Sequence, residues 1–410
     1  GAISFNTISS KKRVFFADSV VLATGGHTRI WKRSSSRKDE NNGDGIYLAL
    51  EAGCKLIDME MVQFHPTGML LPEDKAGTLV TEAVRGEGGQ LFNKKGERFM
   101  KKYDPIRMEL STRDRVAIAC YTEIMKGNCT NNEGILLDIS HRSKDYILEK
   151  LPQIYNQFLE FQNLDISKEA MEIAPTAHYS MGGIKVSPAS HSTGIKGLFA
   201  AGEVAGGLHG ANRLGGNSLA EIIVFGKKAG KASALYAKEL KNKIRSQEEV
   251  KEANKKIDFL IKKGTENPFI LLNEIGEIMW EYCGVIREEK KLKIGLDKIK
   301  QLKEKFNNLE VKINNQNCDQ LIAAFNLQSS IISSEATIIS AIKRNESRGA
   351  HQRSDFKEID RKQQFSYSIK LEKSNKLRID KENKFLLRDE LQKIVLSSKE
   401  IYNYEGKLLE

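Results

Sequence analysis

The sequence predicts an α/β fold in which a parallel-sheet domain carries an inserted α+β domain and is followed by a helical bundle and a small C-terminal domain. Two apolar runs, at residues 19–23 and 197–201, each end in a glycine turn, as buried parallel strands do at a ligand-facing loop. Between them, residues 64–177 consist of polar loops and short helices, which indicates a separate inserted domain. Residues 233–345 are charged and helix-periodic with few strand signals, which predicts a bundle.

The first segment, residues 1–63, alternates strand with glycine-rich loop. Strands are expected at 13–16 and 19–23, and the turn at 42–45 precedes an apolar helix at 46–52. The chain opens on strand-like sequence without an initiator Met, and its first residues match neither a signal peptide nor a transit peptide. We therefore expect a truncated chain whose first domain lacks its N-terminal part.

The inserted domain, residues 64–177, is expected to hold a hairpin in the glycine-rich stretch 86–96 and a helix at 113–125. Residues 178–232 return to the glycine-rich strand and helix sequence of the first segment. The chain therefore leaves the first domain and re-enters it.

The later part of the chain is predicted to be mainly helical. About three helices are expected within 233–345, and the apolar stretch 321–342 is interrupted by polar residues, which favours a buried helix. Residues 346–410 form the predicted C-terminal domain, in which 365–371 alternates like a strand.

The composition limits the class of protein. The chain has 410 residues, of which 40% are hydrophobic and 29% charged, enough for two or three domains with cores. It contains no run of about 20 apolar residues, so a soluble chain without a membrane span is expected. The formal net charge is +11, but no zinc-finger spacing or aromatic RNA-binding motif accompanies it. A solvated basic face is favoured over a nucleic-acid site.

The five cysteines include no C-x-x-C pair. Their odd number and scattered spacing favour free thiols in a reducing compartment. No metal site is expected in this chain, so any iron–sulfur cluster must belong to a partner.

Five blocks of polar and glycine residues carry the functional signal. Together they contain two histidines, two arginines and a threonine that suit the binding of an anion. The blocks are Gln63-Phe64-His65-Pro66-Thr67-Gly68, Thr81-Glu82-Ala83-Val84-Arg85-Gly86-Glu87-Gly88-Gly89, Thr112-Arg113-Asp114, Ala177-His178-Tyr179-Ser180-Met181-Gly182-Gly183, and Ala201-Gly202-Glu203 with His209-Gly210-Ala211-Asn212-Arg213-Leu214-Gly215-Gly216-Asn217-Ser218-Leu219.

In this order, the blocks closely resemble the flavoproteins of succinate dehydrogenase and fumarate reductase. The resemblance is dense over residues 20–230 and resumes at 346–351. It implies an incomplete Rossmann-like FAD-binding domain with an inserted capping domain that serves the substrate. It also implies interconversion of succinate and fumarate, with a hydride passing between FAD N5 and a substrate carbon. FAD is the implied cofactor, because no side chain stores two electrons.

The resemblance assigns the two ends of a C4 dicarboxylate to two donor pairs. His65 and Thr81 are implied to hold one carboxylate, and His178 and Arg213 the other. The chemistry agrees, because the planar fork of Arg matches a carboxylate in a bidentate manner. Histidine and threonine add directional donors without a second full charge.

The resemblance implies that Arg113 donates the proton to fumarate or accepts it from succinate, through a relay of Glu82 and Arg85. Glu82 and Arg85 are three residues apart, so a helical turn places them on one face. The high pKa of free Arg makes Arg113 an awkward acid, and proton-transfer reasoning alone favours His178.

The residues implied to contact FAD are of three kinds: glycines, residues with a hydroxyl or carboxylate group, and residues at the start of a helix. Glycine permits close backbone approach, and a helix N-terminus favours negative charge on a reduced flavin ring. These residues are Thr24, Gly25, Gly26, Asp44, Glu203, Ser218 and Leu219. No G-x-G-x-x-G loop occurs in the 410 residues, so we expect this chain alone to bind FAD weakly or not at all.

Partners and alternatives follow from the same resemblance. An iron–sulfur subunit is expected to exchange electrons with the flavin, and the chain is expected in the cytoplasm, held at the inner face of the cytoplasmic membrane through partner subunits.

One alternative function is that of L-aspartate oxidase, a related enzyme with the same motif blocks. Its usual sequence after the arginine is Met-Ala-Ser-Asn-Ser-Leu, whereas residues 214–219 here read Leu-Gly-Gly-Asn-Ser-Leu. A second alternative is an inactive fragment without cofactor. Gly206-Gly207 is more similar to the soluble fumarate reductases, and 215–218 to the quinone-linked complexes.

Overall fold

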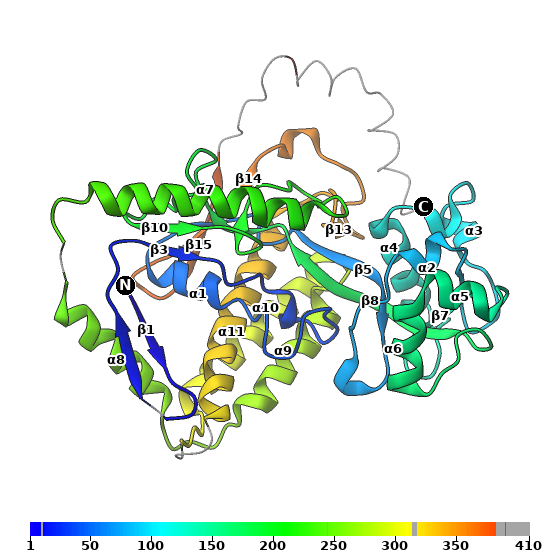
Figure 1. Ribbon diagram of the computed structural model, residues 1–410, viewed down its shortest axis with the longest axis horizontal. Coiled ribbons are helices and arrows are strands. Elements are labelled where there is room, and N and C mark those ends of the chain that lie inside the picture. The colour runs from blue at the N-terminus through cyan, green and yellow to red at the C-terminus, as the bar shows by residue number, and fades with distance from the viewer. Residues whose placement is uncertain (10, 244, 314–317, 383–389, 391–410) are drawn as a thin grey trace.

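Two bodies joined by a pair of long antiparallel strands make up the structure, a computed structural model that describes residues 1–9, 11–243, 245–313, 318–382 and 390. The connecting strands are β5 (Val62–Met69) and β8 (Met171–Ser180), which run from the larger body into the smaller one (Figure 1). The fold is α/β with mixed sheets, as the sequence predicts.

The predicted parallel strands of the first domain lie side by side. β3 (Val20–Leu22) pairs in parallel with β10 (Leu198–Ala200), although 175 residues of chain separate them. The strand expected at 13–16 is β2 (Lys12–Phe15), and it pairs with β1 (Ala2–Phe5) in an antiparallel hairpin of their own. It does not continue the sheet of β3.

A second sheet of the larger body draws on distant parts of the chain. Its strand order is β11 (Ala205–Gly206), β9 (Gly183–Lys185), β4 (Leu56–Ile57), β14 (Ser366–Leu371) and β15 (Leu377–Glu382). Helix α1 (Asp44–Glu51) packs between this sheet and helix α11 (Asp319–Lys343). Gly43, which precedes α1 at φ 86°, lies so close to Ser333 that a Cβ would be 2.1 Å from the serine hydroxyl oxygen.

The smaller body is built on the sheet β5-β8-β7-β6, with β6 at Gln90–Phe92 and β7 at Ile135–Asp138. The hairpin expected at 86–96 is wrong, because β6 pairs with β7, more than 40 residues further along the chain. The helices of this body are α2 (Ala83–Gly86), α3 (Met100–Tyr103), α4 (Arg113–Met125), α5 (Lys144–Lys150) and α6 (Pro152–Gln162). Helix α4 has the predicted bounds.

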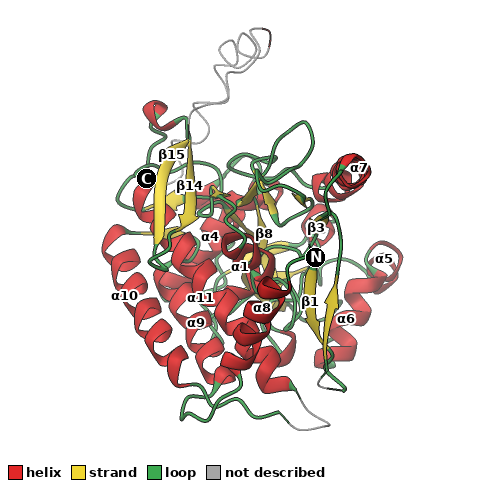
Figure 2. Cartoon of the chain, turned by 90° about the vertical axis from the view of Figure 1, so that its left-hand side faces the viewer, coloured by secondary structure: helices red, strands yellow, loops and turns green. Residues whose placement is uncertain are grey.

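The helical part contains four helices within the described residues of 245–345, where the sequence predicts about three. They are α8 (Gln247–Leu260), α9 (Pro268–Tyr282), α10 (Glu289–Lys305) and α11. Figure 2 shows α9, α10 and α11 packed side by side. α11 is buried along most of its length, as predicted for 321–342, because it contacts both this bundle and α1.

Helix α7 (Asn217–Glu239) lies across one side of the larger body, above β3 and β10 (Figure 1). Several apolar side chains of its first half are exposed: Leu219, Ile222, Ile223 and Val224. None of the helices in the described ranges combines the length and the apolar character that crossing a membrane requires.

The remaining elements are short. They are β12 (Ile286–Arg287) paired in parallel with β13 (Gln352–Arg353), and single 3-10 turns at Thr28–Ile30, Glu73–Lys75, Met108–Leu110, Phe306–Asn308 and Arg361–Gln363.

Candidate active site

His65 and His178 lie on the two strands that join the bodies. Their ring centroids are 5.4 Å apart, in an edge-to-face arrangement. The ladder between β5 and β8 shifts register between His65 and Gly68, so the strand pair is irregular next to the histidines. Such irregularities redirect side chains and commonly occur beside active sites.

His65 presents a hydrogen-bond donor from its Nε2 atom. The Thr67 amide donates to His65 Nδ1 at 3.3 Å, and the Thr67 hydroxyl donates to the Val80 carbonyl at 2.7 Å. With Nδ1 acting as acceptor, the ring proton is on Nε2. Burial, with the nearby His178 and Arg113, lowers the pKa of His65 well below its ordinary value, so the ring is neutral.

His178 is also neutral at pH 7. Burial lowers its pKa to about 4, and the positive charges of Arg213 and Arg113 act in the same direction. Its Nδ1 atom is hydrogen bonded with the Ser35 hydroxyl at 2.9 Å, which leaves Nε2 for a ligand. Sequence reasoning missed Ser35, whose backbone reaches β8 through a 2.9 Å bond from its amide to the Ala177 carbonyl.

Arg113 is the first residue of α4 and faces the same region from the smaller body. Its Nε donates to Glu82 Oε2 at 2.6 Å. A Cβ on Gly215 would be 3.2 Å from Arg113 Nη2, so the backbone of the loop before α7 closely approaches this guanidinium. Arg113 therefore lies between the two bodies.

The predicted pairing of Glu82 with Arg85 is present. Glu82 Oε1 is 3.4 Å from Arg85 Nη2, so this carboxylate contacts both Arg113 and Arg85. Arg85 is 2% exposed and donates to the Glu109 carbonyl at 2.5 Å, and burial lowers its pKa. Thr81 accepts a 3.4 Å bond from the Ala83 amide, which uses a lone pair of its hydroxyl and not its proton.

Arg213 is buried on the other side of the site. Its Nη2 donates to Gln63 Oε1 at 3.0 Å, and its Nη1 has longer contacts with the Leu214 carbonyl at 3.3 Å and Ser218 Oγ at 3.4 Å. Burial lowers the pKa of Arg213, with a further contribution from Arg113. Gln63 belongs to the first motif block, but the sequence pattern indicates no role for it.

The arrangement concentrates positive charge around two neutral histidines. Arg113 lowers the pKa values of both histidines and of Arg213, and Arg213 lowers the pKa of His178. A site of this kind attracts an anion with two negative ends. The structure therefore brings together His65, His178, Arg113 and Arg213, with Glu82 and Arg85 behind Arg113.

The residues expected at FAD form part of a cradle. A Cβ on Gly26 would be 2.4 Å from Glu203 Oε1, and Gly25 has φ 75°, so both positions need glycine. Glu203 accepts a 2.9 Å bond from the Ser180 amide, and burial raises its pKa to about 7. This half-buried carboxyl group, beside half-buried Gly25 and buried Gly26, suits the hydroxyl groups of a ribityl chain.

Four further residues are expected around this cradle. Thr24 contacts Gly45, where a Cβ would be less than 2 Å from the threonine hydroxyl. Asp44 begins α1, and its half-buried carboxyl group is hydrogen bonded with Ser329 of α11. Ser218 and Leu219 are in the first turn of α7, one residue after the helix begins, and Leu219 is 66% exposed. The glycine backbone, the half-buried carboxyl group of Glu203 and the helix N-terminus together fit part of FAD.

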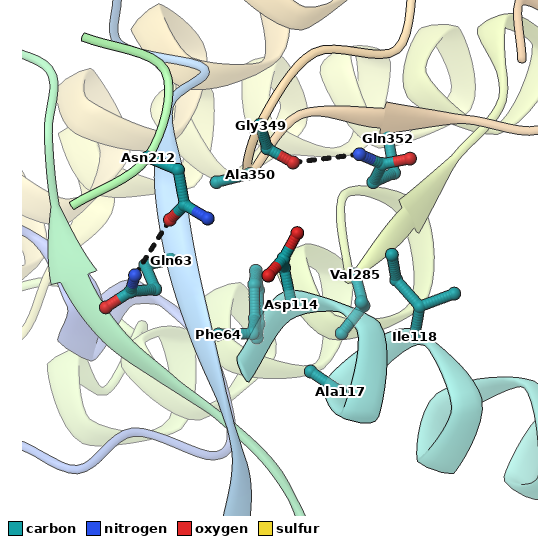
Figure 3. A pocket seen from close by; sticks show the side chains of 10 residues that line it. All are labelled: Gln63, Phe64, Asp114, Ala117, Ile118, Asn212, Val285, Gly349, Ala350 and Gln352. Atoms are coloured by element: carbon teal, nitrogen blue, oxygen red, sulfur yellow. Dashed lines mark hydrogen bonds between the residues drawn. The ribbon is translucent and has the colours of Figure 1, made fainter. Parts of the chain in front are cut away.

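A small pocket adjoins the site behind Gln63. Figure 3 shows Gln63 bonded to Asn212 at one wall and the Asp114 side chain pointing from the start of α4 into the space. The other lining residues are Phe64, Ala117, Ile118, Val285, Gly349, Ala350 and Gln352. Within the described residues, no group of three or more His, Cys, Asp or Glu side chains could hold a metal ion.

Comparisons with known proteins identify the family of the chain. Residues 1–219 match the family described as FAD binding domain, and residues 272–394 match the fumarate reductase flavoprotein C-terminal family. The chain belongs to the succinate dehydrogenase and fumarate reductase flavoprotein family. The domain family binds FAD, which is therefore the cofactor of this chain's family.

Several members of this family are similar to the chain over most of its length. A fumarate reductase (CoM/CoB) chain from Methanothermobacter marburgensis is 44% identical, with 87% of this chain and 64% of that protein covered. The succinate dehydrogenase flavoprotein subunit of Coxiella burnetii is 39% identical, with 88% and 63% covered. The chain thus spans less than two thirds of the length of these relatives.

Solved structures of the family share the fold. Sdh1 of Mycobacterium smegmatis has a TM-score of 0.88 at 37% identity, with 98% of this chain and 68% of that one covered. FrdA of the E. coli quinol fumarate reductase has a TM-score of 0.88 at 33% identity, with 94% and 68% covered.

Proposed function

We propose that the protein interconverts succinate and fumarate as the flavoprotein component of a redox enzyme. One observation carries the proposal: two arginines from different bodies and two neutral histidines from the strands between them converge on one site. The names of the relatives support the substrate class.

The proposed roles are those that the family resemblance implies, and the charge and placement of the side chains support them. His65 Nε2 and the Thr81 hydroxyl donate to one carboxylate, and His178 Nε2 and the Arg213 guanidinium donate to the other. FAD, when bound, supplies or accepts the hydride. Arg113 carries the proton and exchanges it along Glu82 and Arg85. A His178 pKa of about 4 supports Arg113, because a ring that stays neutral at pH 7 is a poor proton donor there.

The cradle residues position the cofactor beside the substrate. Gly25 and Gly26 allow the backbone to approach it, Glu203 accepts hydrogen bonds from its hydroxyl groups, and the α7 N-terminus at Ser218 and Leu219 stabilises negative charge on the ring system. Thr24 and Asp44 complete the proposed set of residues at the cofactor.

The division into domains is part of the proposal. It assigns 1–63 and 178–232 to the FAD-binding domain, 64–177 to the capping domain, 233–345 to the helical domain and 346–410 to the C-terminal domain. In this arrangement an iron–sulfur subunit exchanges electrons with the flavin and holds the chain at the inner face of the cytoplasmic membrane.

The test uses the full-length, FAD-loaded protein and measures fumarate reduction by a reduced dye. L-aspartate oxidation with oxygen is measured in parallel. We expect fumarate turnover and no oxidation of L-aspartate. Oxidation of L-aspartate without fumarate turnover would assign the chain to L-aspartate oxidase, and absence of both activities would support the inactive alternative.

A further inference from the structure

Arg213 lies over an aromatic ring that the roles above leave unused. The Arg213 guanidinium carbon is 4.3 Å from the centroid of the Tyr179 ring, and both residues are buried. A cation over an aromatic face is attracted by the ring, and more strongly where water is excluded. The stack therefore restricts the plane of the guanidinium group.

The Tyr179 ring is itself fixed from α7. Its hydroxyl donates to Glu221 Oε2 at 2.5 Å, and His209 Nε2 is 2.8 Å from the same oxygen. Glu221 is 3% exposed, and the His209 ring meets the Tyr179 ring edge-on with centroids 5.5 Å apart. A buried carboxylate with two short hydrogen bonds holds its partners in place more firmly than a neutral acceptor would.

Gln63 holds the guanidinium from a second direction. Its Nε2 donates to Asn212 Oδ1 at 2.7 Å and to the Arg213 carbonyl at 2.8 Å, which directs Oε1 toward Arg213 Nη2. The remaining polar atoms are less engaged, since Nη1 has only the longer contacts of 3.3 and 3.4 Å and Nε is buried without a partner among the described residues. Arg213 is thus held in one orientation, and its Nη1 and Nε atoms can still donate hydrogen bonds to a ligand.

We propose that Tyr179, locked by Glu221, is a positioning residue that sets the plane in which Arg213 meets the substrate carboxylate. This inference rests on the proposed role of Arg213 in binding. Bidentate recognition requires the guanidinium and carboxylate to be nearly coplanar, and a tilt of about 20° already weakens it. Because Glu221 lies one turn after Ser218 on α7, the helix that begins at the flavin cradle also orients the substrate's arginine.

The test measures fumarate kinetics and malonate affinity in the full-length, FAD-loaded enzyme for Tyr179→Phe, Arg213→Lys and the double variant. Tyr179→Phe keeps the ring but loses the bond to Glu221. We expect it to raise the KM for fumarate and the malonate Kd about fivefold, with kcat within about twofold of wild type. In the Arg213→Lys background, it should change the malonate Kd by less than about twofold, because its effect acts through the guanidinium.

The matched control is Tyr236→Phe, which removes a hydroxyl from a tyrosine of α7 that packs on Phe199, away from Arg213. It should leave all three constants unchanged. Unchanged malonate affinity in Tyr179→Phe, or equal effects of that substitution in both backgrounds, would overturn the positioning role alone. An Arg213→Lys variant that binds malonate as well as wild type would overturn the binding role of Arg213 and the positioning role with it.

Discussion

Arg113 and Glu82 are joined by a 2.6 Å bond from the guanidinium Nε to a carboxylate oxygen, while the other oxygen of Glu82 lies 3.4 Å from buried Arg85. The carboxylate thus bridges two arginines, one at the candidate site and one buried beneath it. Glu82 is partly exposed, so the bridge connects the site with solvent.

Substituting Arg113 by Lys should nearly abolish turnover and leave dicarboxylate affinity largely intact. Lysine keeps the charge but loses the planar fork that reaches both substrate and Glu82. We expect kcat for fumarate to fall at least about 100-fold and the malonate Kd to change less than about threefold. Arg115→Lys, two residues further along α4 and paired with Asp104, is the matched control. Retention of more than about a tenth of kcat would move the acid role to His178.

The Glu82→Gln variant tests the relay. Glutamine retains an oxygen that accepts from Arg113 Nε, so Arg113 stays in place, but the amide cannot carry the proton. We expect kcat to fall roughly 10- to 100-fold with malonate affinity unchanged. Glu87→Gln, at a residue bonded to the Tyr146 hydroxyl, serves as control. If kcat stayed within about twofold of wild type, the proton would have another route.

Stability should decrease as the pH falls below about 6.5. His178 has a folded-state pKa of about 4 against an ordinary value of 6.5, so between these values the unfolded chain binds the proton and the folded chain does not. The free energy of unfolding should therefore fall toward pH 4 by up to about 1.4 kcal/mol per pH unit from this group. Urea unfolding of His178→Gln should show a shallower dependence, whereas exposed His141→Gln should match wild type. Equal slopes in both variants would contradict the prediction.

FAD retention depends on parts of the site that this sequence contains and a phosphate loop that it does not. The 410-residue chain should purify colourless, because no G-x-G-x-x-G loop is available for the pyrophosphate. In the full-length protein, Gly26→Ala should lower the FAD content, since its Cβ would be 2.4 Å from Glu203 Oε1. Gly226→Ala, with open space around the position, is the control. A yellow 410-residue chain with stoichiometric FAD would refute the first part.

The features that sequence predicts well are local ones. Helix 113–125 and the runs at 19–23 and 197–201 are found because their periodicity and their glycine boundaries lie within the segment itself. The hairpin at 86–96 fails because its glycines indicate a turn, whereas the strand's partner is β7, whose register no local pattern specifies.

The residues of the candidate site also differ in how well the sequence predicts them. The motif blocks supply the arginines and histidines that converge, since a charged or donor side chain has a recognisable chemistry. Ser35 and Glu221 have no such pattern, and they matter only because distant segments bring them to His178 and Tyr179. The residues that hold the site residues in place are selected by tertiary contacts, which cannot be predicted from a single sequence.

The chain leaves the larger body on β5 and returns on the adjacent strand β8. Two splice points in this strand pair are therefore enough to exchange the whole smaller body between two related proteins. The paired positions Gly68 and Ala174 lie beyond both histidines on the side of the smaller body. A chimaera spliced there keeps His65 and His178 from one parent and takes Glu82, Arg85 and Arg113 from the other. The strand pair thus places His65, His178 and Arg213 in one exchangeable genetic unit, and Thr81 in the other unit together with Glu82, Arg85 and Arg113.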